Sequence, residues 1–239
     1  MNSKFSVYRG LLLMILSLLL WNIPATHTYL KQADVSFAKL LNSTLDNYVL
    51  AKFWAFFNQS FESYLNALAM LVTTLLYIVY SKNKIRTLSN VLLLLVYLNI
   101  CFGIKKYIIV DLFDVYRDSP SLSIDGFVRL SELFPNQRIK DSASRSFIGD
   151  HAFAMFFWIF FTSRFMSNKF HLVIKFLGVF FSLPRMFSGA HWLSDTLFAI
   201  FAADFLVHIV TSTPLYDFFV TRIEKLLIRV KGFSNLAKK

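Results

Sequence analysis

The sequence is poor in the residues on which many soluble folds depend. A single cysteine, Cys101, cannot form an internal disulfide. Only seven Gly and five Pro are present, which argues against a low-complexity chain. Charged residues make up 16% of the 239 residues, and hydrophobic residues make up 56%. Because soluble domains are about 25% charged, this composition predicts a multi-pass membrane protein.

Acidic residues are scarcer still, since 14 Asp and Glu stand against 25 Lys and Arg, for a net charge of +11. Such a balance can indicate nucleic-acid binding. Here no soluble domain combines a basic patch with exposed aromatic residues. We therefore expect the basic residues to meet anionic lipid headgroups, and we expect no nucleic-acid partner.

Six apolar stretches are long enough to cross a bilayer, which needs about 17–25 residues for each helix. They are residues 7–23, 64–80, 90–109, 149–165, 170–187 and 192–210. The mixed segment 28–60 predicts helices that lie along the membrane surface. The expected fold is all-α: a polytopic helix bundle with six transmembrane helices and an interfacial helical segment, forming one membrane domain over residues 1–239.

The first stretch leaves an alternative open. It is short and follows Lys4 and Arg9, as in a cleavable signal peptide that would end near Ala25. If the stretch is retained, the even number of spans places both termini on the same side of the membrane. If it is removed, the later spans keep their orientation.

Basic residues gather in alternate connections and set the orientation. Four clusters share one side: Lys4 and Arg9; Lys82, Lys84 and Arg86; Arg164 and Lys169; and the basic residues of the tail 213–239. The positive-inside rule makes this side cytoplasmic, together with both termini. Segments 24–63, 110–148 and 188–191 then lie at the outer face. The compact loops suit a bacterial inner membrane, whose outer face is periplasmic.

Near the C-terminus, three ionisable residues interrupt membrane-like sequence: Arg185, His191 and Asp195. The topology brings His151, one span earlier, to the same outer face. Ionisable groups at membrane depth are costly and mark functional sites. If a helix begins near His191, Asp195 lies one turn later and can bond one imidazole nitrogen. The other nitrogen is then left for chemistry.

A metal site, a proton relay or a phosphoryl-transfer site could use these residue types. Zinc usually needs three or four ligands, whereas the only local pair is His191 and Asp195, and Arg185 would repel a cation. A guanidinium suits phosphate oxygens. A histidine held by a carboxylate can attack phosphorus, and a second histidine can protonate the departing oxygen. The pattern therefore favours phosphoryl transfer.

Two motifs carry a family resemblance. The sequence Arg185-x5-His191-x3-Asp195 resembles the last signature motif of the type 2 phosphatidic acid phosphatase family, which is related to vanadium haloperoxidases. Phe147-Ile-Gly-Asp-His151-Ala resembles the middle motif of that family, usually written Pro-Ser-Gly-His. The order of the motifs and the single span between them also agree with the family.

The resemblance implies a role for each motif residue within a phosphatase-like core of about residues 60–212. His191 would attack phosphorus and form a phosphohistidine. Asp195 would orient His191 and support its imidazolium. His151 would protonate the leaving group and then activate water, and Arg185 would hold phosphate oxygens. The family needs no metal and no other cofactor.

The middle motif departs from the family pattern. Gly149 and Asp150 stand where Ser and Gly are usual, so the serine hydroxyl contact is missing or is supplied by Ser146. Gly149 could still offer its backbone N–H to an oxyanion. Pro184 replaces the usual Ser before Arg185, which removes another small donor.

The first motif, Lys-x6-Arg-Pro, is not present in that form. Arg117 with Pro120 resembles a stretched Arg-Pro pair, and Lys106 stands eleven residues before Arg117 instead of seven. Lys140, which closely precedes the middle motif, is an alternative phosphate-binding lysine. Arg145 is a further candidate. These residues leave the composition of the phosphate site open.

The sequence therefore predicts a lipid phosphate or pyrophosphate phosphatase that hydrolyses a phosphoester at the outer, periplasmic face. The substrate candidates are undecaprenyl pyrophosphate, lipid A phosphate and phosphatidylglycerol phosphate, each held by its tails in the bilayer. One alternative is a phosphotransferase that passes the phosphoryl group to another lipid such as lipid A. A second is a non-catalytic transporter or scaffold that binds lipid phosphate, which the altered first motif and the missing serine favour.

Overall fold

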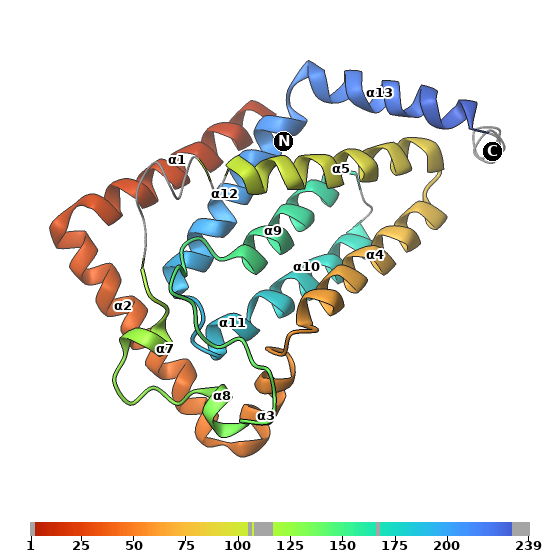
Figure 1. The fold of residues 1–239 in the computed structure, drawn as a ribbon. Coiled ribbons are helices and arrows are strands. Elements are labelled where there is room, and N and C mark those ends of the chain that lie inside the picture. The colour runs from red at the N-terminus through yellow and green to blue at the C-terminus, as the bar shows by residue number, and fades with distance from the viewer. Residues whose placement is uncertain (1–2, 105–106, 108–116, 166–167, 231–239) are drawn as a thin grey trace.

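The computed structural model describes residues 3–104, 107, 117–165 and 168–230 of the chain. Within these ranges the regular structure is helical, apart from one isolated antiparallel bridge between Gln59 and Ile139 (Figure 1). The prediction of an all-α fold is confirmed for this part of the chain.

The described chain contains both long and short helices. In order, they are α1 (Ser3–Asn22), α2 (Pro24–Ser43), the 3-10 helix η1 (Thr44–Asp46), α3 (Tyr48–Phe56), α4 (Glu62–Tyr80), α5 (Lys84–Ile104), α7 (Pro120–Ser123), α8 (Leu130–Leu133), α9 (Asp150–Thr162), α10 (Asn168–Ser182), α11 (Pro184–Phe187), α12 (Leu193–Thr211) and α13 (Pro214–Arg229).

Several helices have the length and apolar composition of membrane spans. In the described part of the chain, four qualify: Glu62–Tyr80, Lys84–Ile104, Phe170–Phe187 and Leu193–Thr211. Helices α1 and α2, which meet at a bend of 99°, make a fifth if counted together. Helix α9 has 13 residues and is about 20 Å long, short of the roughly 30 Å hydrocarbon core. The chain is therefore a multi-span membrane protein, while the predicted number of six spans stays a prediction.

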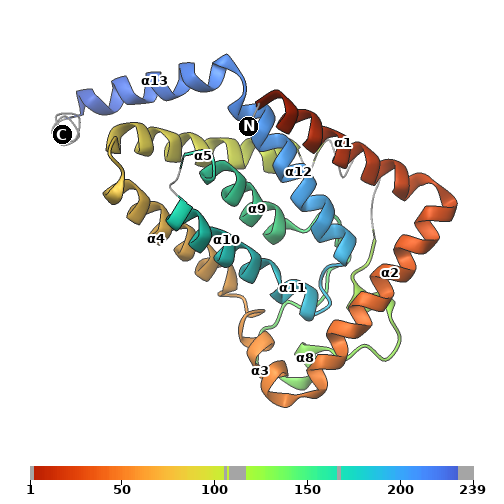
Figure 2. The same cartoon turned by 180° about the vertical axis from the view of Figure 1, so that it is seen from behind.

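Helix α9 lies in the middle of the bundle, between α5, α10 and α12 (Figure 2). Its large side chains Phe153, Phe157, Trp158 and Phe161 are all 1% exposed or less. Apolar residues on every face of a helix are typical of one buried on all sides. The Phe-rich sequence of α9 thus builds the core of the bundle and fixes the start of this helix, which carries His151.

Two of the basic segments predicted to share one side, the α4–α5 turn and α13, lie together. Helix α13 and the α4–α5 turn are at one end of the bundle, and α2, α3, α8 and α11 are at the other (Figures 1 and 2). Arg86, near the start of α5, forms ion pairs with Asp217 at 3.2 Å and Glu224 at 3.6 Å. The assignment of this end to the cytoplasm stays a prediction.

The predicted interfacial segment 28–60 folds as part of α2, then η1 and α3. Helix α2 turns one narrow face towards the bundle, with Asp34, Ala38 and Asn42 buried at intervals of four residues. Residues four apart lie on one face of a helix. This face brings Asp34 to the beginning of α12.

Candidate active site

The residues singled out from the motifs gather where α9, α11 and α12 meet, at the end opposite to α13. Arg185 Nη2 lies 3.0 Å from His151 Nε2, although the two residues are 34 positions apart. A Cβ placed on Gly149 would lie 3.8 Å from two ring carbons of His191. The two motifs thus form a single site, as their predicted positions at one face require.

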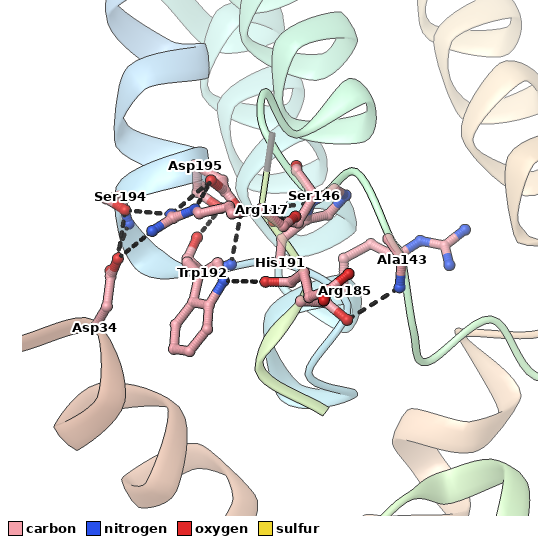
Figure 3. A network of polar contacts seen from close by, with 12 residues as sticks. Asp34, Arg117, Ala143, Ser146, Arg185, His191, Trp192, Ser194 and Asp195 are labelled. Atoms are coloured by element: carbon pink, nitrogen blue, oxygen red, sulfur yellow. Dashed lines mark hydrogen bonds and ion pairs between the residues drawn. The ribbon is translucent and has the colours of Figure 1, made fainter. Parts of the chain in front are cut away.

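A backbone carbonyl orients His191. The His191 Nδ1 atom is 2.8 Å from the carbonyl oxygen of Ser146 (Figure 3). A carbonyl can only accept, so Nδ1 carries the hydrogen and Nε2 keeps its lone pair. Asp195 Oδ2 is 3.8 Å from Nδ1, which is an ion-pair distance and longer than a hydrogen bond. Ser146 therefore fixes the tautomer, and Asp195 adds negative charge beside the ring.

Asp195 is fully buried and fixed at the first turn of α12. Its Oδ2 accepts the backbone N–H of Trp192 at 3.0 Å. Its Oδ1 accepts from Arg117 Nε at 3.0 Å and Arg117 Nη2 at 2.6 Å (Figure 3). A carboxylate is favoured at a helix N-terminus, and the guanidinium compensates its charge.

The Arg117 guanidinium joins α2 to α12. It donates from Nη1 to Asp34 at 3.0 Å and from Nη2 to the Ser194 hydroxyl at 2.5 Å. It also lies over the rings of Trp21 and Trp192, at 4.7 and 5.3 Å from their centroids. In this geometry all three of its nitrogens bond to protein acceptors. The contact of Arg117 with phosphate stays a prediction. The observed contacts hold α2 against the start of α12.

Arg185, in α11, contacts His151, and its side chain is 7% exposed. It donates from Nη1 to the carbonyl oxygen of Lys140 at 2.7 Å and from Nη2 to Glu62 Oε2 at 3.2 Å. Its buried Nε has no hydrogen-bond partner within the described ranges. A buried donor without an acceptor is costly, so this atom favours an anionic ligand at the site.

His151 lies between Arg185 and a second buried carboxylate. An arginine only donates, so His151 Nε2 accepts from Arg185 Nη2 in this geometry. The hydrogen of the neutral ring is then on Nδ1, which is 3.4 Å from Glu62 Oε1 and equally 3.4 Å from the side-chain nitrogen of Asn66. Asn66, one turn later in α4, donates to that same oxygen.

The other predicted phosphate ligands have mixed placements. Gly149 caps the N-terminus of α9 directly against the His191 ring. The Ser146 hydroxyl donates to the carbonyl oxygen of Arg117 at 3.2 Å, and this bond joins two segments of the loop region. The Lys140 side chain is exposed, while its backbone N–H bonds to Asn58. Their contacts with phosphate stay predictions.

Two candidate phosphate-binding residues remain, Arg145 and Lys106. Arg145 is exposed on the loop that precedes α9. Lys106 lies outside the described residues, so the predicted role of that lysine has no structural counterpart here.

The chain matches a known family over the region that holds both motifs. Residues 120–218 match the PAP2 superfamily. This segment is less than half of the chain, and over it the chain is similar to the PAP2 superfamily. His151, Arg185, His191 and Asp195 all fall within the matched segment, and the resemblance to the type 2 phosphatidic acid phosphatases is thereby confirmed.

One curated relative matches over a comparable length. The lipid A 1-diphosphate synthase of Escherichia coli (strain K12) is 32% identical over 126 residues, which is 52% of this chain and 53% of that protein. The chain thus spans about half the length of the curated relative that it matches. No solved structure matches the chain.

Three polar residues of the site lie before the PAP2 segment. Asp34 and Glu62 were missed in the sequence, and Arg117 was expected to bind phosphate. Asp34 bonds to Ser194, which is 160 positions away, through both the backbone N–H at 2.9 Å and the hydroxyl at 2.5 Å. Helices α2 and α4 therefore complete a site whose motif residues all belong to the PAP2 segment.

The donor set does not resemble a metal centre. No group of three or more His, Cys, Asp or Glu side chains that could hold a metal ion occurs among the described residues. The carboxylates closest to the two histidines are each compensated by an arginine instead, Asp195 by Arg117 and Glu62 by Arg185.

A tight turn between Arg185 and His191 sets the position of the nucleophile candidate. The Arg185 carbonyl oxygen accepts the N–H groups of Ala190 at 2.9 Å and His191 at 3.2 Å. Gly189 has φ +77°, and a Cβ there would lie 2.4 Å from Phe127 Cε1. Only glycine combines this backbone angle with this close approach at no cost.

Replacing Gly189 with alanine is expected to lower the thermal unfolding midpoint and to weaken phosphate release, because the turn that carries His191 must shift. The added contact should cost about 1–3 kcal/mol beyond the strain of the backbone angle. Gly126→Ala is the matched control, since Gly126 has φ +71° with nothing within 4 Å of its would-be Cβ. Equal losses in the two variants would contradict the packing argument.

Proposed function

We propose that the chain is a membrane-embedded phosphoryl-transfer enzyme that acts on a lipid phosphate or pyrophosphate through a phosphohistidine on His191. The observation that carries this proposal is the 2.8 Å hydrogen bond between His191 Nδ1 and the carbonyl oxygen of Ser146. This bond leaves Nε2 as an unprotonated nucleophile. The PAP2 segment supports the same reaction class.

The first half-reaction follows from the placement of charge around His191. A phosphoryl group at this site would meet Arg185, including its unpartnered Nε, and the positive end of α9 at Gly149. Nε2 of His191 attacks phosphorus as the bond from phosphorus to the leaving oxygen breaks. Asp195 stabilises the positive imidazole that forms. His151 Nε2, once protonated, gives its hydrogen to the leaving oxygen.

The second half-reaction reverses these roles. Water attacks the phosphohistidine, the phosphorus–nitrogen bond breaks, and the water proton passes to His151 Nε2. Phosphate leaves, His151 Nε2 returns its proton to solvent, and both histidines are again in their starting protonation states. Acid and base catalysis by one histidine accounts for both steps.

An apolar cavity beside the site supports a lipid as the substrate. It has a volume of about 220 Å³ and lies among α1, α2, α12 and the loop before α9. Its lining residues are Ser17, Leu20, Trp21, Leu30, Phe147, Ser194, Leu197, Phe198 and Phe201. Phe147 adjoins Ser146, so an apolar part of a substrate would have space close to the reacting group. Undecaprenyl pyrophosphate, lipid A phosphate and phosphatidylglycerol phosphate remain the candidates, with the site at the periplasmic face of a bacterial inner membrane and both termini cytoplasmic.

A lipid acceptor in place of water is the second candidate function. The relative from Escherichia coli is named a lipid A 1-diphosphate synthase, which favours transfer of the phosphoryl group to a lipid. Mass spectrometry of products formed with and without lipid A distinguishes the two. A phosphorylated lipid product supports transfer, and free phosphate alone in both reactions supports hydrolysis.

Activity is expected to persist in EDTA and to be blocked by vanadate. The protein groups at the site supply the positive charge themselves, and vanadate adopts the five-coordinate geometry of phosphorus in the transition state. Phosphate release from a lipid phosphate in vesicles measures both effects. An absolute requirement for Mg²⁺, shown by restoration of lost activity on its addition, would contradict this mechanism.

A further inference from the structure

Glu62 is a buried carboxylate that neither sequence motif includes. It lies in the first turn of α4, before the PAP2 segment, and is 0% exposed. Its Oε2 accepts from Arg185 Nη2 at 3.2 Å, and its Oε1 lies 3.4 Å from His151 Nδ1. A buried carboxylate persists only where cations and donors compensate it. Glu62 therefore depends on the residues that the reaction would use.

The same Arg185 nitrogen contacts both Glu62 and His151. Nη2 is 3.2 Å from the carboxylate and 3.0 Å from His151 Nε2. Because Nε2 accepts this hydrogen bond, it carries no proton in this geometry. His151 can give no proton to a leaving group in this state, so something must add one.

Phosphate binding changes the balance of charge. A phosphate dianion that takes up the donors of Arg185 weakens the compensation of Glu62 and removes the donor from His151 Nε2. The buried carboxylate then favours a second positive charge close by. The nearest group that can acquire one is His151, whose Nδ1 faces Glu62 Oε1 at 3.4 Å.

We propose that Glu62 is the positioning residue of the general acid: when an oxyanion engages Arg185, the Glu62–His151 pair takes up one proton, which comes to lie on His151 Nε2. The proton comes from solvent, and it is the one later passed to the leaving oxygen. This inference rests on the proposed function. It makes His151 an acid only when phosphate is bound.

Other ionisable groups lie near the Glu62–His151 pair and influence its proton uptake. They are Arg185 of α11, Lys140 of the preceding loop, Asp150 of α9 and His191 of the turn before α12. The Lys140 ammonium is near enough to interact with the Glu62 charge and opposes protonation of His151. Glu62 is the carboxylate in ion-pair contact with the His151 ring, and for this reason we assign the proton uptake to their pair.

The kinetic test is Glu62→Gln, which keeps the shape and removes the charge. Phosphate release from a lipid phosphate, which has a poor alkoxide leaving group, should fall about 100-fold. Release from p-nitrophenyl phosphate, whose leaving group needs no proton, should stay within about threefold. Glu62→Asp should recover part of the loss. Glu132→Gln is the matched control, because Glu132 is an exposed residue of α8.

A direct test uses the wild-type protein and therefore does not depend on how the variant folds. Sulfate is an oxyanion that does not titrate near neutral pH, so a proton taken up on its binding belongs to the protein. In nitrogen-15 spectra of histidine-labelled protein, His151 should be neutral with hydrogen on Nδ1, and sulfate should convert it to imidazolium. The His151 signals are those that His151→Gln removes.

Two results would overturn the proposal for Glu62. One is equal loss on both substrates in Glu62→Gln. The other is a His151 ring whose protonation sulfate leaves unchanged. Failure of the proposed function is distinguishable, since the wild-type protein itself would then release no phosphate from either substrate, whatever the spectra show.

Discussion

Replacing His191 with alanine is expected to abolish phosphate release, with a fall in kcat of at least about 10⁴-fold. The reaction loses its nucleophile, the imidazole whose Nδ1–H donates to the Ser146 carbonyl oxygen and whose Nε2 is left for attack on phosphorus. Steady-state assays on a lipid phosphate in vesicles measure the loss. Binding of the lipid should change little, because the groups that hold phosphate remain.

His171→Ala is the matched control for this variant. His171 lies near the start of α10, away from the motif residues, so its loss should leave kcat within about threefold of wild type. Equal activity in His191→Ala and wild-type protein would contradict the catalytic account. It would instead favour the reading of the chain as a transporter or scaffold that binds lipid phosphate.

Replacing Arg185 with alanine is expected to damage both activity and stability. Loss of a charged donor that stabilises the transition state should lower kcat about 10²–10³-fold. Arg185 is 5% exposed and its partner Glu62 is 0% exposed, so the variant leaves a buried charge uncompensated. The free energy of unfolding should fall by about 3–5 kcal/mol. Denaturation in mixed micelles and kinetic assays measure the two effects.

A double variant separates the two effects of Arg185. In Arg185→Met with Glu62→Met, the buried charge and its partner are both removed, so much of the lost stability should return. Activity should not return. Arg138→Ala, which removes an exposed arginine, is the control and should leave both quantities near wild type. A single Arg185→Ala variant as active as wild type would contradict the assignment of phosphate binding to Arg185.

The sequence was sufficient to predict the motif residues and their gathering at one end of the bundle. Apolar length marks the spans, and alternate basic connections place His151, Arg185 and His191 at the same face, so their meeting follows from topology. The length of the helix at 149–165 was less predictable. The described helix runs from Asp150 to Thr162, and turn residues occupy 163–165.

Residues that act through tertiary contacts could not be predicted in the same way. Asp34 and Glu62 lie in segments without a motif, and each meets an arginine more than 80 positions away. Nothing in a single sequence distinguishes such carboxylates from exposed ones. Arg117 was predicted to bind phosphate because Arg117 and Pro120 resemble a stretched Arg-Pro pair, and its ion pair with Asp34 could not be foreseen.

The orientation of His191 shows a further limit. Spacing suggested Asp195 as the hydrogen-bond partner, since the two residues are four positions apart. The observed acceptor at 2.8 Å is the carbonyl oxygen of Ser146. Every residue has a backbone carbonyl, so no pattern of side chains in the sequence could identify Ser146 as the hydrogen-bond partner of His191. Asp195 instead fixes the start of α12 and binds Arg117.

The most direct test of the central claim is to detect phosphate on His191 itself. Protein that is turning over a lipid phosphate would be quenched in alkali, which preserves phosphohistidine, then digested and sequenced by tandem mass spectrometry. His151→Ala should increase the trapped fraction with an activated aryl phosphate, because this variant retains the nucleophile and lacks the residue that activates water. The account predicts a phosphoryl group on the His191 imidazole that is absent from His191→Ala. Turnover with no phosphate on His191, or with the label on another residue, would contradict it.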